Sequence, residues 1–154
     1  MLAAVRALGA DLGLAALAMA EVTAAKGRGQ RHRIAFGDEG LLIIDESYNA
    51  SPIAMTAAID ALGAVEPAPL GRRIAVLGDM LELGETAPDL HGALAPALVA
   101  AGIDQVFACG PNMAHLFDAL PKSMRGAHAE TSAQLLPKVM AAVRPGDTVL
   151  VKGS

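Results

Sequence analysis

The sequence predicts an α/β protein with a Rossmann-like, mostly parallel sheet and helices on both faces. Apolar runs such as Ile74–Leu77 and Gln105–Ala108 alternate with helical stretches of about 10–14 residues, and such alternation forms βαβ units with parallel strands. Ile74–Leu77 is closed by Gly78 and Asp79, as is typical of a buried parallel strand. The chain is 53% hydrophobic and 18% charged, which excludes a disordered polypeptide.

Two short helices are predicted in residues 1–22, on either side of Gly9–Gly13. Leu2, Val5 and Leu8 have the spacing of one helix face, and Leu14, Leu17 and Ala18 that of another. Met1, Arg6 and the small residues 18–20 also fit a signal peptide, although Asp11 interrupts its apolar part. Residues 24–33 (AAKGRGQRHR) then break the pattern with glycines and basic side chains, which predicts a linker.

The sheet is expected to begin with two short strands, Arg33–Phe36 and Leu41–Asp45, joined by a turn at 37–40. Ser51 as N-cap and Pro52 at the first helical position then start a helix to about Val65. The later elements are a strand at 74–77, a helix at about 88–101, a strand at 105–108, a helix from 113 through 120, a short strand at 126–129, a helix capped by Thr131 and running to 143, and a strand at 147–151.

The charge and the cysteine content of the chain exclude several classes of function. A net charge of −4 gives no electrostatic footprint for nucleic acid. The single cysteine, Cys109, excludes an internal disulfide and a cysteine-rich zinc site, and it fits a reducing compartment. No apolar run reaches the roughly 18 residues that a membrane-spanning helix needs. We therefore expect a cytoplasmic protein without membrane insertion.

The polar residues at the carboxyl ends of the predicted strands mark the expected functional edge, because open α/β sheets bind ligands there. In the segment Asp45–Pro52, a carboxylate could accept two hydrogen bonds from a ribose diol, and the following helix N-terminus favours anionic groups. We expect Asp45 and Asn49 to face the crevice beyond this edge. An ordinary strand-to-helix turn with a surface charge is the alternative. No phosphate-binding loop and no Gly-x-Gly-x-x-Gly motif that opens a helix occurs in the chain.

Three further residues have both a structural and a functional interpretation. Arg28 lies between two glycines, so its backbone can turn and present the guanidinium to a phosphate or ribose, although basic runs are commonly solvated surface. His91 lies near the start of a predicted helix, where a histidine is commonly structural. Cys109 follows an apolar strand and is expected to be a buried thiol.

Four motifs occur in order along the chain: KGRGQ, DESYNASP, IAVLGDMLELGE with His91 downstream of it, and VLVKGS. Together they resemble the C-terminal part of Mur ligases, and specifically of those that add D-alanyl-D-alanine to UDP-MurNAc-tripeptide by way of an acyl phosphate. The resemblance implies that residues 1–24 are the last helices of the central ATPase domain and that residues 25–154 are the C-terminal domain without its final helix. It also implies that the enzyme uses ATP and Mg²⁺, with the phosphate-binding loop and the Mg²⁺ ligands upstream.

The resemblance assigns residues motif by motif. ATP contacts fall on Arg28, Asp45 and Tyr48, and substrate contacts fall on Asn49, Ser51, Asp79, His91, Lys152 and Ser154. It implies no catalytic or metal-binding residue in this chain, which should be inactive without the other domains. Two positions depart from the family pattern: Ser51 stands where asparagine is usual, and Lys26 where proline is common. A stand-alone nucleotide-binding module and another Mur-type ligase, such as folylpolyglutamate synthase, are the alternative functions.

Overall fold

The structure is a computed structural model, which describes residues 2–21 and 23–154. Its sheet has the strand order β1-β2-β6-β3-β4-β5, with all neighbours parallel except the antiparallel pair β1 and β2. The strands are β1 (Gln30–Ile34), β2 (Leu41–Glu46), β3 (Arg73–Gly78), β4 (Gln105–Cys109), β5 (Arg125–Ala129) and β6 (Thr148–Lys152). The predicted mostly parallel sheet is confirmed.

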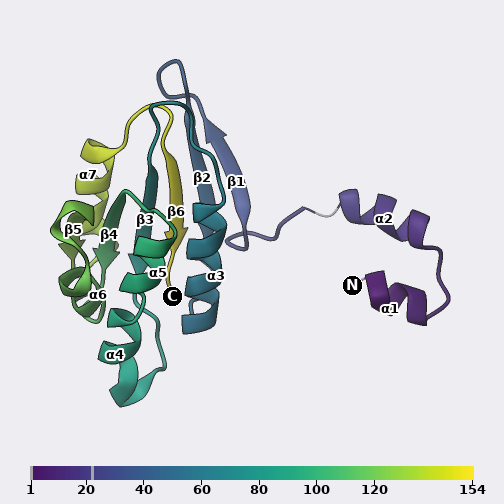
Figure 1. The fold of residues 1–154 in the computed structure, drawn as a ribbon, viewed down its shortest axis with the longest axis horizontal. Coiled ribbons are helices and arrows are strands. Elements are labelled where there is room, and N and C mark those ends of the chain that lie inside the picture. Colours follow the sequence, from purple (N-terminus) through teal and green to yellow (C-terminus); the bar gives the residue numbers. More distant parts are fainter. Residues whose placement is uncertain (1, 22) are drawn as a thin grey trace.

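Helices cover both faces of the sheet, as predicted (Figure 1). One face carries α3 (Pro52–Gly63), α4 (Ala87–Gly92), α5 (Ala95–Ala100) and α6 (Met113–Ala119), and the other carries α7 (Ser132–Ala142). The two predicted caps are present: Ser51 Oγ accepts from Ala54 N at 3.3 Å, and Thr131 Oγ1 accepts from Gln134 N at 3.3 Å. Short 3-10 turns occur at Gly84–Thr86 and Lys122–Met124.

Each face has its own apolar core. The larger core includes Met55, Leu77 and Leu98, between the sheet and α3, α5 and α6. The smaller core joins Phe107 to Leu135, beneath α7. Alternate residues of a strand point to opposite faces, so each strand contributes to both cores.

Two predicted elements differ from the structure. The helix expected at 88–101 is divided into α4 and α5, because Pro96 has no N–H to donate to the preceding turn and its ring crowds the carbonyl four residues earlier. The first strand is Gln30–Ile34 rather than Arg33–Phe36, so part of the predicted linker belongs to the sheet. Phe36 instead belongs to the turn, where its carbonyl accepts from Gly40 N at 3.1 Å.

A buried carboxylate holds the amino ends of the central strands. Asp147 is 1% exposed and accepts from the backbone N–H and the guanidinium of Arg72, at 2.7 Å for the closest pair. It also accepts from Arg144 N at 2.9 Å. Since these contacts satisfy the charge, this end of the sheet is fixed structurally and the opposite end carries the candidate site.

The two N-terminal helices, α1 (Leu2–Ala7) and α2 (Leu12–Ala20), lie apart from the sheet (Figure 1). Asp11 caps α2 by accepting from Leu14 N at 2.8 Å. Several apolar side chains of α2 are largely exposed, with Leu14 at 69% and Leu17 at 68%. Within the described residues, no helix is long and apolar enough to cross a membrane.

Candidate functional site

The carboxyl ends of β2, β6, β3 and β4 meet at one edge of the sheet, and the predicted polar residues follow them. The ends of β3 and β6 approach closely, since a Cβ added to Gly153 would lie 2.9 Å from the Cα atom of Gly78. Nothing larger than glycine fits at that point without a backbone shift. The loops after these strands are thereby brought together.

Arg28 and Tyr48 form a stacked pair beside this edge. The Gly27 carbonyl accepts from Tyr48 N at 3.1 Å, and Gly29 N donates to the Asp45 carbonyl at 2.8 Å. Both glycines have positive φ, and a Cβ on Gly27 would lie 2.9 Å from Tyr48 N. This turn places the Arg28 guanidinium carbon 4.0 Å from the centre of the Tyr48 ring, within cation–π range. The Tyr48 side chain remains 64% exposed, so the pair is open to a ligand.

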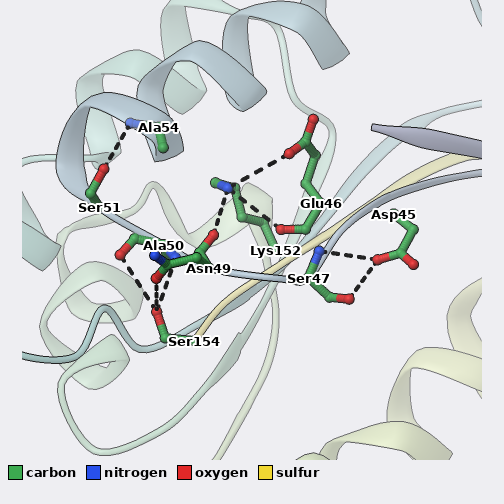
Figure 2. A network of polar contacts seen from close by, with 9 residues as sticks. All are labelled: Asp45, Glu46, Ser47, Asn49, Ala50, Ser51, Ala54, Lys152 and Ser154. Atoms are coloured by element: carbon green, nitrogen blue, oxygen red, sulfur yellow. Dashed lines mark hydrogen bonds and ion pairs between the residues drawn. The ribbon is translucent and has the colours of Figure 1, made fainter. Parts of the chain in front are cut away.

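Asp45 lies at the end of β2, next to this pair. One carboxylate oxygen accepts from Ser47 Oγ at 2.5 Å and from Ser47 N at 3.0 Å (Figure 2). These two hydrogen bonds lower the pKa of Asp45, and nearby His32 and Lys26 lower it further. The group is therefore a carboxylate at neutral pH, held in orientation by Ser47.

Asn49, Ser51 and Ser154 gather at the start of α3. Asn49 Oδ1 accepts from Ala50 N at 2.7 Å and lies 3.4 Å from Ser154 Oγ. Ser154 Oγ also accepts from Ala50 N at 3.0 Å, as Figure 2 shows. The hydroxyl of Ser51 is used as the α3 cap. Asn49, Ser51 and Ser154 are all exposed, and the one hydrogen bond of Ser51 is the internal cap.

Lys152 lies under this loop rather than facing solvent. It is 4% exposed, and its Nζ donates to the Asn49 carbonyl at 2.9 Å and to the Glu46 carbonyl at 3.5 Å. The Glu46 carboxylate is 3.9 Å away. Burial lowers the pKa of Lys152, and Glu46 partly offsets that effect. In this conformation the ammonium is directed to the protein's own backbone and not to a substrate carboxylate.

Asp79 caps α6 from a distant strand. One oxygen accepts from Met113 N at 2.8 Å, and the other accepts from the backbone and side-chain nitrogens of Asn112 at 3.2 and 3.1 Å. Its side chain is only 11% exposed. Gly110 makes room for it, because a Cβ there would overlap the Asp79 carboxyl group. The carboxylate expected to meet substrate therefore performs a structural role here.

His91 is fully buried in the last turn of α4, not at a helix start as predicted. Its Nε2 accepts from Met80 N at 2.9 Å, and Nδ1–H donates to the Ala87 carbonyl at 2.6 Å. Nε2 thus supports the Asp79–Leu83 loop, Nδ1 is held by the first residue of the histidine's own helix, and neither nitrogen faces solvent. Cys109, by contrast, is partly exposed, and burial raises the pKa of its thiol.

An apolar groove of about 860 Å³ runs along the α7 face of the sheet, with Ser47, Asp79 and Lys152 at its polar end. Neither Asp45 nor Asn49 lines it. By strand alternation, Asp45 continues the α7-facing row of Leu41 and Ile43 on β2. Asn49 contacts Lys152 near the start of α3. The sequence led us to expect that both residues face one crevice. In the structure they do not share one.

The structure divides the nine predicted residues into three groups. Arg28, Asp45 and Tyr48 form one cluster. Asn49, Ser51, Lys152 and Ser154 form a second, and Asp79 and His91 hold the loop after β3. Sequence reasoning missed Ser47, which orients Asp45, and Glu46, which lies beside Lys152. The only sequence signal for Ser47 was its position two residues after an acid, where a serine commonly bonds back to the carboxylate.

Metal ligands are not gathered in the part of the chain described. Across residues 2–21 and 23–154, no three His, Cys, Asp or Glu side chains come together as a metal site requires. The chemistry available at this edge is recognition through a cation, an aromatic ring, a carboxylate and exposed amide and hydroxyl groups.

Comparison with known proteins gives a consistent set of relatives. The family model described as "Mur ligase, glutamate ligase domain" matches residues 27–154. A relative named UDP-N-acetylmuramoyl-tripeptide–D-alanyl-D-alanine ligase, from Rickettsia prowazekii, is 30% identical over 96% of this chain and 31% of its own length. A Bacillus subtilis protein with the same name is 35% identical over 82% of this chain and 28% of its own length.

A solved structure of the MurF ligase of Thermotoga maritima, in complex with ADP, also matches. It has a TM-score of 0.76 and 27% identity, covering 99% of this chain and 33% of that one. The chain thus spans about a third of the length of these relatives.

Proposed function

Since this chain belongs to the Mur ligase family, we propose that it is the C-terminal part of an ADP-forming ligase that joins D-alanyl-D-alanine to UDP-MurNAc-tripeptide. Residues 1–24 would then belong to the central ATPase domain, and residues 25–154 would be the C-terminal domain. The names of the relatives in Rickettsia and Bacillus support this substrate pair. In this proposal the product enters peptidoglycan precursor synthesis.

The observation that carries the proposal is the Arg28–Tyr48 stack beside Asp45. A planar guanidinium suits a phosphate, an exposed aromatic ring offers a flat surface to a base or ribose, and a carboxylate accepts from a ribose diol. The lowered pKa of Asp45 keeps that acceptor ionised. A relative of the same fold was solved in complex with ADP, which supports the use of an adenine nucleotide.

The proposed reaction proceeds in two steps. A carboxylate oxygen of the tripeptide attacks the γ-phosphorus of ATP, the bond to the β-phosphate oxygen breaks, and ADP leaves. The dipeptide amine then attacks the acyl phosphate carbon, loses a proton, and expels inorganic phosphate. This chain would bind the adenosine half of ATP and close over the reactants, which supplies proximity and excludes water.

We assign the dipeptide side of the site to Asn49 and Ser154. Both are exposed, and the Asn49 amide nitrogen and the Ser154 hydroxyl can each donate to a carboxylate. In this structure the polar groups of Ser51, Asp79, His91 and Lys152 are engaged in internal contacts. A contact between substrate and Asp79, His91 or Lys152 would require a conformational change in the loops that carry them, whereas the exposed Ser51 hydroxyl can still donate.

An ADP-release assay on the complete gene product tests the proposal. We expect sustained, multiple-turnover release of ADP only when ATP, UDP-MurNAc-tripeptide and D-alanyl-D-alanine are all present. The isolated 154-residue chain should show no turnover. Turnover with a folate and glutamate would instead indicate the folylpolyglutamate alternative, and a gene product with no phosphate-binding loop upstream would favour a stand-alone module. Tripeptide-dependent turnover by the isolated chain would also contradict the proposal.

A further inference from the structure

Lys152 is the one buried lysine or arginine among residues 2–21 and 23–154, and its side chain is 4% exposed. Burying an ammonium group is costly unless hydrogen bonds replace its hydration. An apolar residue could fill the same space at the end of β6 without that cost. The position of the charge therefore calls for a specific explanation.

The contacts of Lys152 are those of a backbone tether more than those of an ion pair. Nζ is 2.9 Å from the Asn49 carbonyl oxygen, but 3.9 Å from the nearest carboxylate oxygen of Glu46. Figure 2 shows the side chain passing beneath the turn that leaves β2, with both the Glu46 and Asn49 carbonyls directed to it. The ammonium thus holds the two ends of the Glu46–Asn49 turn.

Tyr48 is one of the two central residues of that turn. The Tyr48 backbone N–H donates to the Gly27 carbonyl on one side of the turn. The carbonyl of the following residue, Asn49, accepts from Lys152. On the other side of the turn, Glu46 Oε1 approaches Gly29, where an added Cβ would be 3.1 Å from it. The turn that presents Tyr48 and the turn that presents Arg28 are therefore fixed against each other around the Lys152–Glu46 pair.

We propose that Lys152 is a positioning residue for the nucleotide half of the site: its buried ammonium sets the Glu46–Asn49 turn and so holds Tyr48 under Arg28. This inference rests on the proposed function and adds a residue that does not itself touch the ligand. Loss of the ammonium should loosen Tyr48, weaken ATP binding more than dipeptide binding, and leave the catalytic step almost unchanged.

Tyr48 supplies a direct measurement, because the sequence contains one tyrosine and no tryptophan. The intrinsic fluorescence of the 154-residue chain therefore reports on Tyr48 alone. In Lys152→Met, which keeps an apolar stem but removes the charge, we expect the acrylamide quenching constant to rise at least about twofold and the anisotropy to fall. Lys138→Met, a change at an exposed lysine on α7, is the matched control and should behave as wild type.

Kinetics of the complete gene product form the second arm. We expect Lys152→Met to raise the KM for ATP roughly 10-fold, as for a lost hydrogen bond to a charged group, and to change kcat and the dipeptide KM less than about threefold. Lys152→Arg, which retains a cation and its donors, should recover part of both losses. If Lys152→Met does not fold, the same measurements are made on Lys152→Arg. Wild-type Tyr48 quenching and a wild-type KM for ATP in that variant then support the tether.

The outcomes separate this inference from the proposed function. Unchanged quenching in a folded Lys152→Met chain, or an ATP KM equal to wild type, would overturn the positioning role. Wild-type protein without ligase activity would refute the proposed function, while the fluorescence result would still decide whether Lys152 holds Tyr48. An arginine variant as loose as the methionine variant would also contradict the tether.

Discussion

Replacing Asp79 tests whether its carboxylate has a structural role or binds substrate. In the structure, its two oxygens accept three hydrogen bonds from the first residues of α6, at 2.8 to 3.2 Å. Asp79→Ala would leave the N–H groups of Asn112 and Met113 without these acceptors in a part-buried setting. Loss of an N-cap costs about 0.5–2 kcal/mol, and each buried donor left unpaired adds about 1–3 kcal/mol.

We therefore expect Asp79→Ala to lower the free energy of unfolding by about 2–4 kcal/mol. For a chain of this length, about 2–4 °C is lost per kcal/mol, so Tm should fall by roughly 5–15 °C. Asp79→Asn, which keeps one acceptor, should lose less than half of that. Circular dichroism melts of the 154-residue chain measure both variants.

The matched control is Asp118→Ala on the same helix, where the side chain is 82% exposed and its nearest cation is 3.9 Å away. Its Tm should remain within about 2 °C of wild type, as expected for an exposed ion pair. A wild-type Tm for Asp79→Ala, together with a raised dipeptide KM in the complete gene product, would show that Asp79 is a ligand and that its cap is dispensable.

Three further changes test the loops around the site. Gly27→Ala places a Cβ 2.9 Å from Tyr48 N at a φ of +70°, so urea unfolding should show a loss of about 1–2 kcal/mol and Tyr48 quenching should rise. His91→Ala removes the acceptor for Met80 N and the donor to the Ala87 carbonyl, and should cost about 2–5 kcal/mol in the same assay. His115→Ala, at an exposed histidine on α6, is the control and should unfold as wild type. The pKa of Asp45 is lowered below 3.8 in the folded state, so the unfolded chain takes up this proton first as the pH falls. The free energy of unfolding should therefore decrease as the pH drops through the folded pKa. Urea midpoints measured from pH 7 to pH 3 should show this decrease in wild type, and Asp45→Asn should lack that part of it.

Local chemistry explains what could be predicted from the sequence. Ser51 followed by Pro52, and Thr131 before α7, are short-range capping signals, and both helices begin as expected. Apolar runs closed by glycine identified β3 and β4 for the same reason. The division between α4 and α5 depended on Pro96, a local signal that the apolar periodicity masked.

The roles of individual site residues depend on partners far away in the chain, which a single sequence does not reveal. Asp79 meets Met113, 34 positions later, and Lys152 meets Asn49 across 103 positions. The insertion of β6 between β2 and β3 creates the second contact, and the strand order could not be read from alternation alone. Motifs therefore predicted the edge of the sheet at which these residues gather, but not which side chains face outward.

Steady-state kinetics of Arg28→Ala and Asp45→Ala in the complete gene product decide whether this edge binds the nucleotide. Each change removes a charged partner, so the KM for ATP should rise roughly 10–100-fold, while the KM for D-alanyl-D-alanine changes by less than about threefold. Wild-type kinetics in both variants, or a larger effect on the dipeptide than on ATP, would show that the Arg28–Tyr48–Asp45 cluster does not contact ATP.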